Sequence, residues 1–258
     1  MYKRYYDIDV DAKAYANRIV KAGGRIPSDI VSVSDFIRKL KINNVWGQCI
    51  FWSLRSNQNV GAGNILYSAG NVKAYDGTIS NGTWTDGGIY FNGSNSSVGF
   101  SNFLKTSTLS DFGIFACADF TQLTTSGAIA TTRNFFCSGT DYGIALGANA
   151  FNSGRIMVYD RTTCFSQASA ATKNYHTLSA LSNGNNTVQS FNSTDLASNA
   201  PKITTPLDLE LNIGTMLAGT QQFWLGRIAF VLVSFSPINN NLIRSLYIST
   251  MGKGLGLS

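Results

Sequence analysis

The sequence contains few of the ionisable groups on which enzymes depend. Only 13% of its residues are charged, and it has a single glutamate, Glu210, and a single histidine, His176. Glycosidases need paired carboxylates, which lie roughly 5–5.5 Å apart in retaining enzymes, and alternate positions of a strand provide that spacing. Asp208 and Glu210 form the only Asp-x-Glu pair, and no Gly-x-Ser-x-Gly motif accompanies the histidine. We therefore predict structural roles for these residues, no catalytic residues, and a protein that is not an enzyme.

Cysteine motifs and long apolar runs are also missing. The cysteines form no Cys-x-x-Cys pair and match no zinc-site spacing; they are Cys49, Cys117, Cys137 and Cys164. We predict free thiols in the core, with two disulfides as the alternative in an oxidising compartment. No stretch has the length of a membrane-spanning helix, and residues 1–7 lack the apolar core of a signal peptide. These absences predict no metal site, no membrane insertion and assembly in a cytoplasm.

The net charge of +6 is concentrated near the N-terminus. Residues 1–41 contain 9 of the 20 Lys and Arg residues and 5 of the 14 acidic residues, a local charge of +4. They include no run of basic residues, and such a pattern is typical of a solvated helix face. We therefore predict no nucleic-acid partner.

Helical periodicity occurs mainly in the first 44 residues. The first predicted helix starts after a cap at Asp9 or Asp11 and ends at Gly23-Gly24, because glycine adopts the left-handed conformation at little cost. A second helix is predicted over residues 28–43. Together they form a helical hairpin of about 30 residues, which is too small to hold a core by itself. The hairpin must therefore dock on another surface.

From residue 45 onward the sequence changes to short strands separated by turns rich in Gly, Ser, Thr and Asn. Asn183-Gly184 predicts a tight hairpin between two of these strands, and a short helix is predicted over 240–250. We predict a mainly β antiparallel sandwich over 45–258, preceded by an N-terminal arm and helical hairpin over 1–44. The predicted strands are 50–54, 88–91, 97–100, 112–120, 127–131, 142–146, 155–159, 177–181, 188–191, 211–213 and 223–235.

Three stretches within residues 66–250, taken in order, carry a family resemblance. Residues 81–96 (NGTWTDGGIYFNGSNS) resemble the Trp-containing entry of concanavalin A-like, laminin G-like (LamG) sandwiches. Residues 175–184 (YHTLSALSNG) resemble the Trp-His hairpin of that fold, with Tyr175 in place of Trp. The closing stretch, from Leu211 to Tyr247, resembles the final strands. The resemblance implies a jelly-roll, lectin-like sandwich. Aspartates that match the laminin G-type calcium sites are not found, so we predict no cofactor, and calcium is not supported.

The N-terminus carries a second resemblance. Residues 11–24 (DAKAYANRIVKAGG), a second helix and Trp46 ahead of the sandwich are similar to an arrangement in bacteriophage virion proteins. The resemblance implies a virion structural protein, such as a head decoration, head fibre or tail appendage. Its expected partners are other virion proteins, contacted through residues 1–44, and its expected location is the virion, after assembly in the host cytoplasm. Oligomeric state stays open, a homo-oligomer included.

Four aromatic residues are the candidates for carbohydrate binding. Trp84, Tyr90, Phe223 and Trp224 lie near predicted junctions of loops and strands, where a ring can stack on a sugar. Core packing is the alternative role of each, because sandwich cores use large aromatics heavily. Alternation along a strand directs one of Phe223 and Trp224 inward and the other outward.

Three functions remain open at this point. The first is a virion structural protein whose sandwich binds host-surface glycans. The second is a glycan-active hydrolase of the concanavalin A-like sandwich class, which the shortage of carboxylates disfavours. The third is a decoration protein that binds no ligand.

Overall fold

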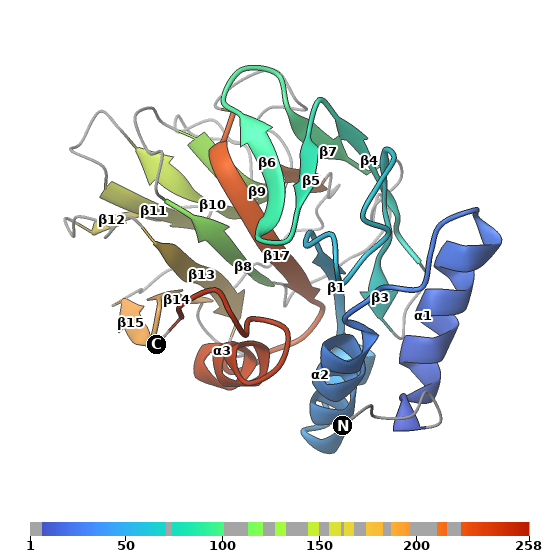
Figure 1. Cartoon of the computed structure of the whole chain (residues 1–258). Coiled ribbons are helices and arrows are strands. Elements are labelled where there is room, and N and C mark those ends of the chain that lie inside the picture. Colours follow the sequence, from blue (N-terminus) through green and yellow to red (C-terminus); the bar gives the residue numbers. More distant parts are fainter. Residues whose placement is uncertain are drawn as a thin grey trace.

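The protein consists of two antiparallel sheets packed face to face, with helices α1, α2 and α3 on the outer side of one sheet (Figure 1). The computed structural model describes residues 7–70, 74–100, 113–120, 127–132, 144–149, 155–160, 163–167, 174–182, 187–196, 211–215 and 223–257. All strand pairs in these residues are antiparallel. This architecture confirms the predicted mainly β sandwich with an N-terminal helix pair.

The larger sheet, sheet A, has the strand order β15-β14-β13-β8-β17-β1-β3, and β6 pairs with both β17 and β5. Its strands are β1 (Cys49–Ser53), β3 (Ala69–Gly70), β5 (Thr83–Thr85), β6 (Gly88–Asn92), β8 (Gly113–Asp119), β13 (Tyr175–Ser182), β14 (Thr187–Phe191), β15 (Thr194–Leu196) and β17 (Leu225–Ser234). The residues of the predicted turn at Asn183-Gly184 lie outside the described residues, but β13 and β14 pair on either side of it.

The second sheet, sheet B, has the order β12-β11-β10-β9-β16-β7-β4-β2. Its strands are β2 (Ile65–Leu66), β4 (Gly77–Ser80), β7 (Ser97–Gly99), β9 (Gly127–Thr132), β10 (Ile144–Asn149), β11 (Arg155–Asp160), β12 (Thr163–Gln167) and β16 (Leu211–Ile213). Strands β2 to β5, β12 and β15 were not predicted. Most of them have only two to four residues, too few to show an alternating pattern.

Both faces of sheet A are apolar in its central strands. Toward sheet B, Trp52 and Val231 enter the core between the sheets, together with Ile213 from the opposite side. On the outer face, Phe51 and Phe230 belong to a second cluster under the helices. Strands β1 and β8 are therefore buried along their whole length, and their sequences read as continuous apolar runs.

The helices begin and end at residues whose chemistry explains those positions. They are α1 (Val10–Lys21), α2 (Ile30–Ile42), the short 3-10 helix η2 (Trp46–Gln48) and α3 (Asn240–Ile248). Of the two predicted caps, Asp9 caps α1, because its carboxylate accepts a hydrogen bond from the Asp11 N–H at 2.9 Å. Gly23 follows α1 with φ of +87°, and the Gly24 N–H bonds to the Ile19 carbonyl at 3.0 Å, as in a Schellman motif.

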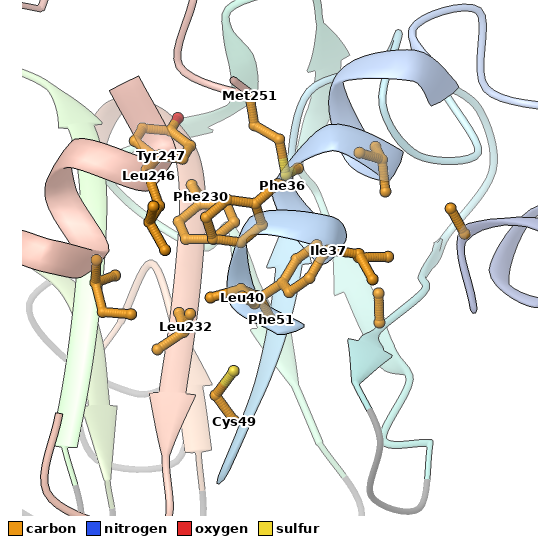
Figure 2. Close-up of a cluster of buried hydrophobic side chains, with 14 of the residues drawn as sticks. Phe36, Ile37, Leu40, Cys49, Phe51, Phe230, Leu232, Leu246, Tyr247 and Met251 are labelled. Carbon is orange, nitrogen blue, oxygen red and sulfur yellow. The ribbon is translucent and has the colours of Figure 1, made fainter. Parts of the chain in front are cut away.

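The predicted helical hairpin docks on its own sandwich. Figure 2 shows the contacts that α2 and α3 make with sheet A. Phe36 of α2 packs edge-on against Phe51 and Phe230, with ring centroids 5.1 and 5.6 Å away. Tyr247 of α3 stacks on Phe230 with centroids 4.5 Å apart. The apolar stripes of the helices are thus buried against the chain's own sheet A. Any partner of the described part of this segment, residues 7–44, meets the outer surface of the hairpin.

Two of the predicted free thiols lie in this cluster. Cys49 and Cys117 are buried and unpaired, and burial raises the pKa of each thiol to about 12. Cys137 lies outside the described residues, and the side chain of Cys164 is not among them. Among the described residues, no helix is long and apolar enough to cross a bilayer.

Candidate functional site

One end of the outer face of sheet A carries a line of polar and aromatic side chains. Helices α2 and α3 lie toward one end of this sheet, whereas β6 lies at the opposite end of β17 (Figure 1). Near β6, four neighbouring strands each contribute one residue. We call these four the tyrosine row: Tyr90 on β6, Arg227 on β17, Asp119 on β8 and Tyr175 on β13.

Strand register places the four side chains side by side. Arg227 pairs directly with Tyr90, and Asp119 pairs directly with Tyr175. Residues directly opposite each other in an antiparallel pair point to the same face. Their neighbours Ile89 and Ile228 enter the core between the sheets, which fixes the row on the outer face. Three spacings between strands separate the backbones of Tyr90 and Tyr175 by about 14 Å.

An ion pair forms the centre of the row. Arg227 Nη1 donates to Asp119 Oδ2 at 3.2 Å. The Asp119 side chain is only 7% exposed, whereas that of Arg227 is 43% exposed. A guanidinium carries five N–H donors in a rigid fork, so Arg227 can hold Asp119 and still offer donors to solvent or to a ligand.

Tyr175 extends across the sheet from β13. Its hydroxyl donates to the Gly87 carbonyl at 2.8 Å, in the turn between β5 and β6. A Cβ added to Gly87 would meet the Tyr175 hydroxyl and would lie 3.1 Å from Arg227 Cδ, so glycine leaves room for both side chains. Burial raises the pKa of Tyr175 above its usual range, and the phenol stays a neutral donor. Tyr175 and Tyr90 are both half-buried; they come from the two outer strands of the row, and the Tyr175 side chain reaches toward β6.

The other predicted aromatics lie elsewhere. Trp84 on β5 is half-buried against the core between the sheets, and its indole N–H donates to the Gly63 carbonyl at 3.0 Å. Phe223 is half-buried. The prediction of Trp224 as a binding residue is wrong: it is 1% exposed and packs edge-on against Phe120, with centroids 5.1 Å apart. Alternation therefore directs Trp224 inward, where a sugar cannot reach it.

Sequence reasoning found Tyr90 but missed its three neighbours in the row. Asp119 is the last residue of β8, and Arg227 lies near the start of β17. Both strands are buried on both faces over most of their length, so their sequences are largely apolar and show no alternation that would mark these two residues. Tyr175 was noted only as a departure from the Trp-His pattern. Their association depends on the pairing of β6, β17, β8 and β13, which spans 138 residues of sequence from 90 to 227.

The residues whose chemistry suits catalysis are His176, Asp208 and Glu210. His176 is buried, and its Nδ1 lies 3.0 Å from the side-chain nitrogen of Asn192. Asp208 and Glu210 lie outside the described residues. Within the part of the chain that the structure describes, no three His, Cys, Asp or Glu side chains gather in a way that could hold a metal ion.

Comparison by sequence identifies no relative: no protein-family model matches the chain, and no curated protein matches it significantly. Comparison by structure does find similar proteins. Trypanosoma rangeli sialidase in complex with 2,3-difluorosialic acid, as a covalent intermediate, aligns with a TM-score of 0.59 and 13% identity over 91% of this chain and 41% of the sialidase. The fold is a concanavalin A-like, lectin-type sandwich.

Two further structures align with the chain. A second T. rangeli sialidase structure aligns with a TM-score of 0.57 and 13% identity over 89% of this chain and 40% of the sialidase. Domain 4 of a GH43 extracellular arabinanase from Geobacillus stearothermophilus, in complex with arabinotriose, aligns with a TM-score of 0.44 and 12% identity over 79% of this chain and 93% of that domain. The lectin-type sandwich thus spans about 41% of the length of the sialidase that it matches.

Proposed function

We propose that this lectin-type sandwich is a non-catalytic glycan-binding module whose ligand lies across the tyrosine row. The observation that carries the proposal is the placement of two half-buried tyrosines on either side of an accessible arginine that is paired with a buried aspartate. The ring of a tyrosine can stack on the apolar face of a sugar. Arg227 supplies donors for sugar hydroxyls or carboxylates.

The Tyr175 side chain brings the two tyrosines closer together than their strands. The backbones of the four strands span about 14 Å, but the Tyr175 hydroxyl reaches Gly87 in the turn beside β6. We infer a glycan that lies against Tyr90, Arg227 and the ring of Tyr175. The sialidase of similar fold was solved with 2,3-difluorosialic acid, which supports glycans as the ligand class to test.

The row holds no pair of carboxylates, because Asp119 is its only acid and is engaged by Arg227. Glycoside hydrolysis commonly uses two acidic groups on opposite sides of the bond that is cleaved. We therefore propose binding without hydrolysis.

The first test is a glycan array followed by calorimetry with the best oligosaccharide. Tyr90→Ala is expected to weaken binding about tenfold, which corresponds to ~1.4 kcal/mol, because one stacking surface is lost. Tyr90→Phe retains the ring and should bind nearly as well as the native chain. Phe223→Ala serves as the matched control, because Phe223 is half-buried like Tyr90 but lies outside the row. The bound oligosaccharide should remain intact by mass spectrometry. Absence of glycan binding, or a loss in Phe223→Ala but not in Tyr90→Ala, would refute the proposal.

We also propose that the module belongs to a bacteriophage virion, as a head decoration, head fibre or tail appendage, and meets other virion proteins through residues 1–44. The large apolar side chains that are exposed among the described residues all lie in this segment: Val10, Val20, Ile26 and Ile42. Val10 and Ile42, 70% and 78% exposed, lie at the same end of the hairpin, where Lys41 Nζ contacts both Asp9 and Asp11 at 2.7 Å. Many copies on one particle would compensate for weak individual glycan sites.

Incorporation into particles tests this docking role. The double variant Val10→Ser, Ile42→Ser changes only exposed positions, so we expect native-like circular dichroism but an at least tenfold lower copy number, about 1.4 kcal/mol of lost contact. Ser80→Ala, an exposed change on sheet B, is the control. Immunoblots of purified particles measure the copy number. Unchanged incorporation of the double variant would remove the role assigned to the hairpin.

A further inference from the structure

A second surface with the features of a binding site lies between the helix pair and sheet B. A cleft of about 710 Å³ opens between the connection of α1 to α2, residues 22–28, and the loop at residues 56–65. Its volume falls within the range of roughly 300–1,000 Å³ typical of small-molecule sites. It shares no lining residue with the tyrosine row. We call it the loop cleft.

Glycines and one buried amide shape the loop cleft. Gly24 allows close approach of the two walls, because a Cβ there would lie 2.8 Å from Val60 Cγ2. Gly61 has φ of +73°, and a Cβ there would lie 2.7 Å from the Ser56 carbonyl oxygen. Asn59 holds the loop from beneath through four hydrogen bonds to backbone groups. The cleft is therefore built by specific residues of a firmly anchored loop.

Tyr67 lines the cleft with an unused polar group. This residue is only 7% exposed, and its backbone N–H and carbonyl are both bound by Asn59. The Arg18 guanidinium lies over its ring, 5.6 Å from the centroid. Its hydroxyl forms no hydrogen bond to any described residue. Among the described residues it is not one of the buried polar atoms that lack a partner, so it meets solvent, where a ligand can reach it.

The charge of the lining has one sign. No aspartate or glutamate lines the loop cleft, whereas Arg25 does and forms no ion pair with any described residue. The backbone N–H groups of residues 61–63 likewise find no acceptor in the described part of the chain. Ile26, 48% exposed, and Val60 add apolar surface. The cation and the free N–H donors suit an anionic group of a ligand, and the apolar walls suit a partly apolar remainder of the same ligand.

We propose that the loop cleft binds a small ligand that carries one carboxylate or phosphate group. Arg25 pairs with the anion, Tyr67 binds it or a neighbouring hydroxyl, and Ile26 and Val60 contact the body of the ligand. This proposal is independent of the glycan role of the tyrosine row, because the two surfaces use different residues.

The test titrates the full chain with three probes: sialic acid, which carries a carboxylate; glucose 6-phosphate, which carries a phosphate; and neutral glucose. We expect at least one anionic probe to bind with a millimolar or lower Kd, and binding by glucose to be at least tenfold weaker, about 1.4 kcal/mol. Tighter binding of sialic acid would indicate a carboxylate ligand, and tighter binding of glucose 6-phosphate would indicate a phosphate ligand. Two-dimensional NMR should place the shifted amides in residues 22–28 and 56–67.

Matched variants assign the binding to the loop cleft. Arg25→Gln changes an exposed side chain, and Tyr67→Phe removes one oxygen while keeping the ring beneath Arg18, so both should fold. Each should weaken the anionic probe about fivefold to tenfold, whereas Tyr90→Ala in the tyrosine row should leave its Kd unchanged. The proposal is overturned if neither anion binds at millimolar concentration, if glucose binds equally well, or if Arg25→Gln and Tyr67→Phe bind like the native chain. Loss of binding in Tyr90→Ala would assign it to the row and also overturn the proposal.

Discussion

Replacement of Phe36 by alanine is expected to lower the free energy of unfolding by about 3–5 kcal/mol. Phe36 is fully buried and contacts Phe51 and Phe230 edge-on, where α2 covers sheet A (Figure 2). Its loss leaves a cavity at the contact between helix and sheet. Because a domain has only about 5–15 kcal/mol of net stability, a change of this size would remove a large fraction of it.

Urea denaturation monitored by tryptophan fluorescence measures this effect. Phe36→Leu should cost less, because leucine fills part of the space. Val20→Ala, on the exposed side of α1, is the control and should change stability by no more than about 0.5 kcal/mol. A cost for Phe36→Ala as small as that of Val20→Ala would show that the helices do not stabilise the sandwich. The same contact implies that removal of the hairpin would expose Phe51 and Phe230 to water and promote aggregation.

Replacement of Asn59 by alanine is expected to cost about 3–5 kcal/mol for a different reason, the loss of several hydrogen bonds at once. The Asn59 amide donates to the Ser53 and Tyr67 carbonyls at 2.8 and 2.9 Å. Its oxygen accepts from the Val60 and Tyr67 N–H groups at 2.8 and 3.3 Å. Asn59 is 1% exposed, so these backbone groups would lose their partner away from bulk water. Each buried group left unsatisfied costs about 1–3 kcal/mol.

Hydrogen exchange and urea denaturation together check the role of Asn59. We expect Asn59→Ala to accelerate amide exchange over residues 53–67 and to lower the urea midpoint. Asn64→Ala, an exposed asparagine on the same loop, should leave both unchanged. The outcome that contradicts the expectation is a stability loss below about 1 kcal/mol, the net value of a single ordinary hydrogen bond. Such a result would mean that the loop does not depend on this side chain and that the loop cleft is not held in one shape.

Features that depend on neighbouring residues in the sequence were predicted well, whereas contacts between distant segments were not. The helices at 10–21 and 30–42, and β6 and β8, were predicted within two residues, because caps, periodicity and glycine ends are local signals. Trp224 was assigned to a binding site because its position near a loop junction resembles that of a surface platform. Its real environment, beside Phe120, depends on the fold of residues distant in sequence.

Local chemistry alone determined the fold class of this protein, the positions of its helices and the scarcity of groups suited to catalysis. Hydrophobic periodicity and turn residues act over a few positions and can be read without knowledge of partners. Tertiary structure alone decided which strands are neighbours, and thereby joined Tyr90, Arg227, Asp119 and Tyr175 into one row and set Tyr67 at the loop cleft. The physical reason is that strand register and burial on both faces of sheet A arise from contacts between segments far apart in the chain. One-dimensional patterns contain no record of those contacts.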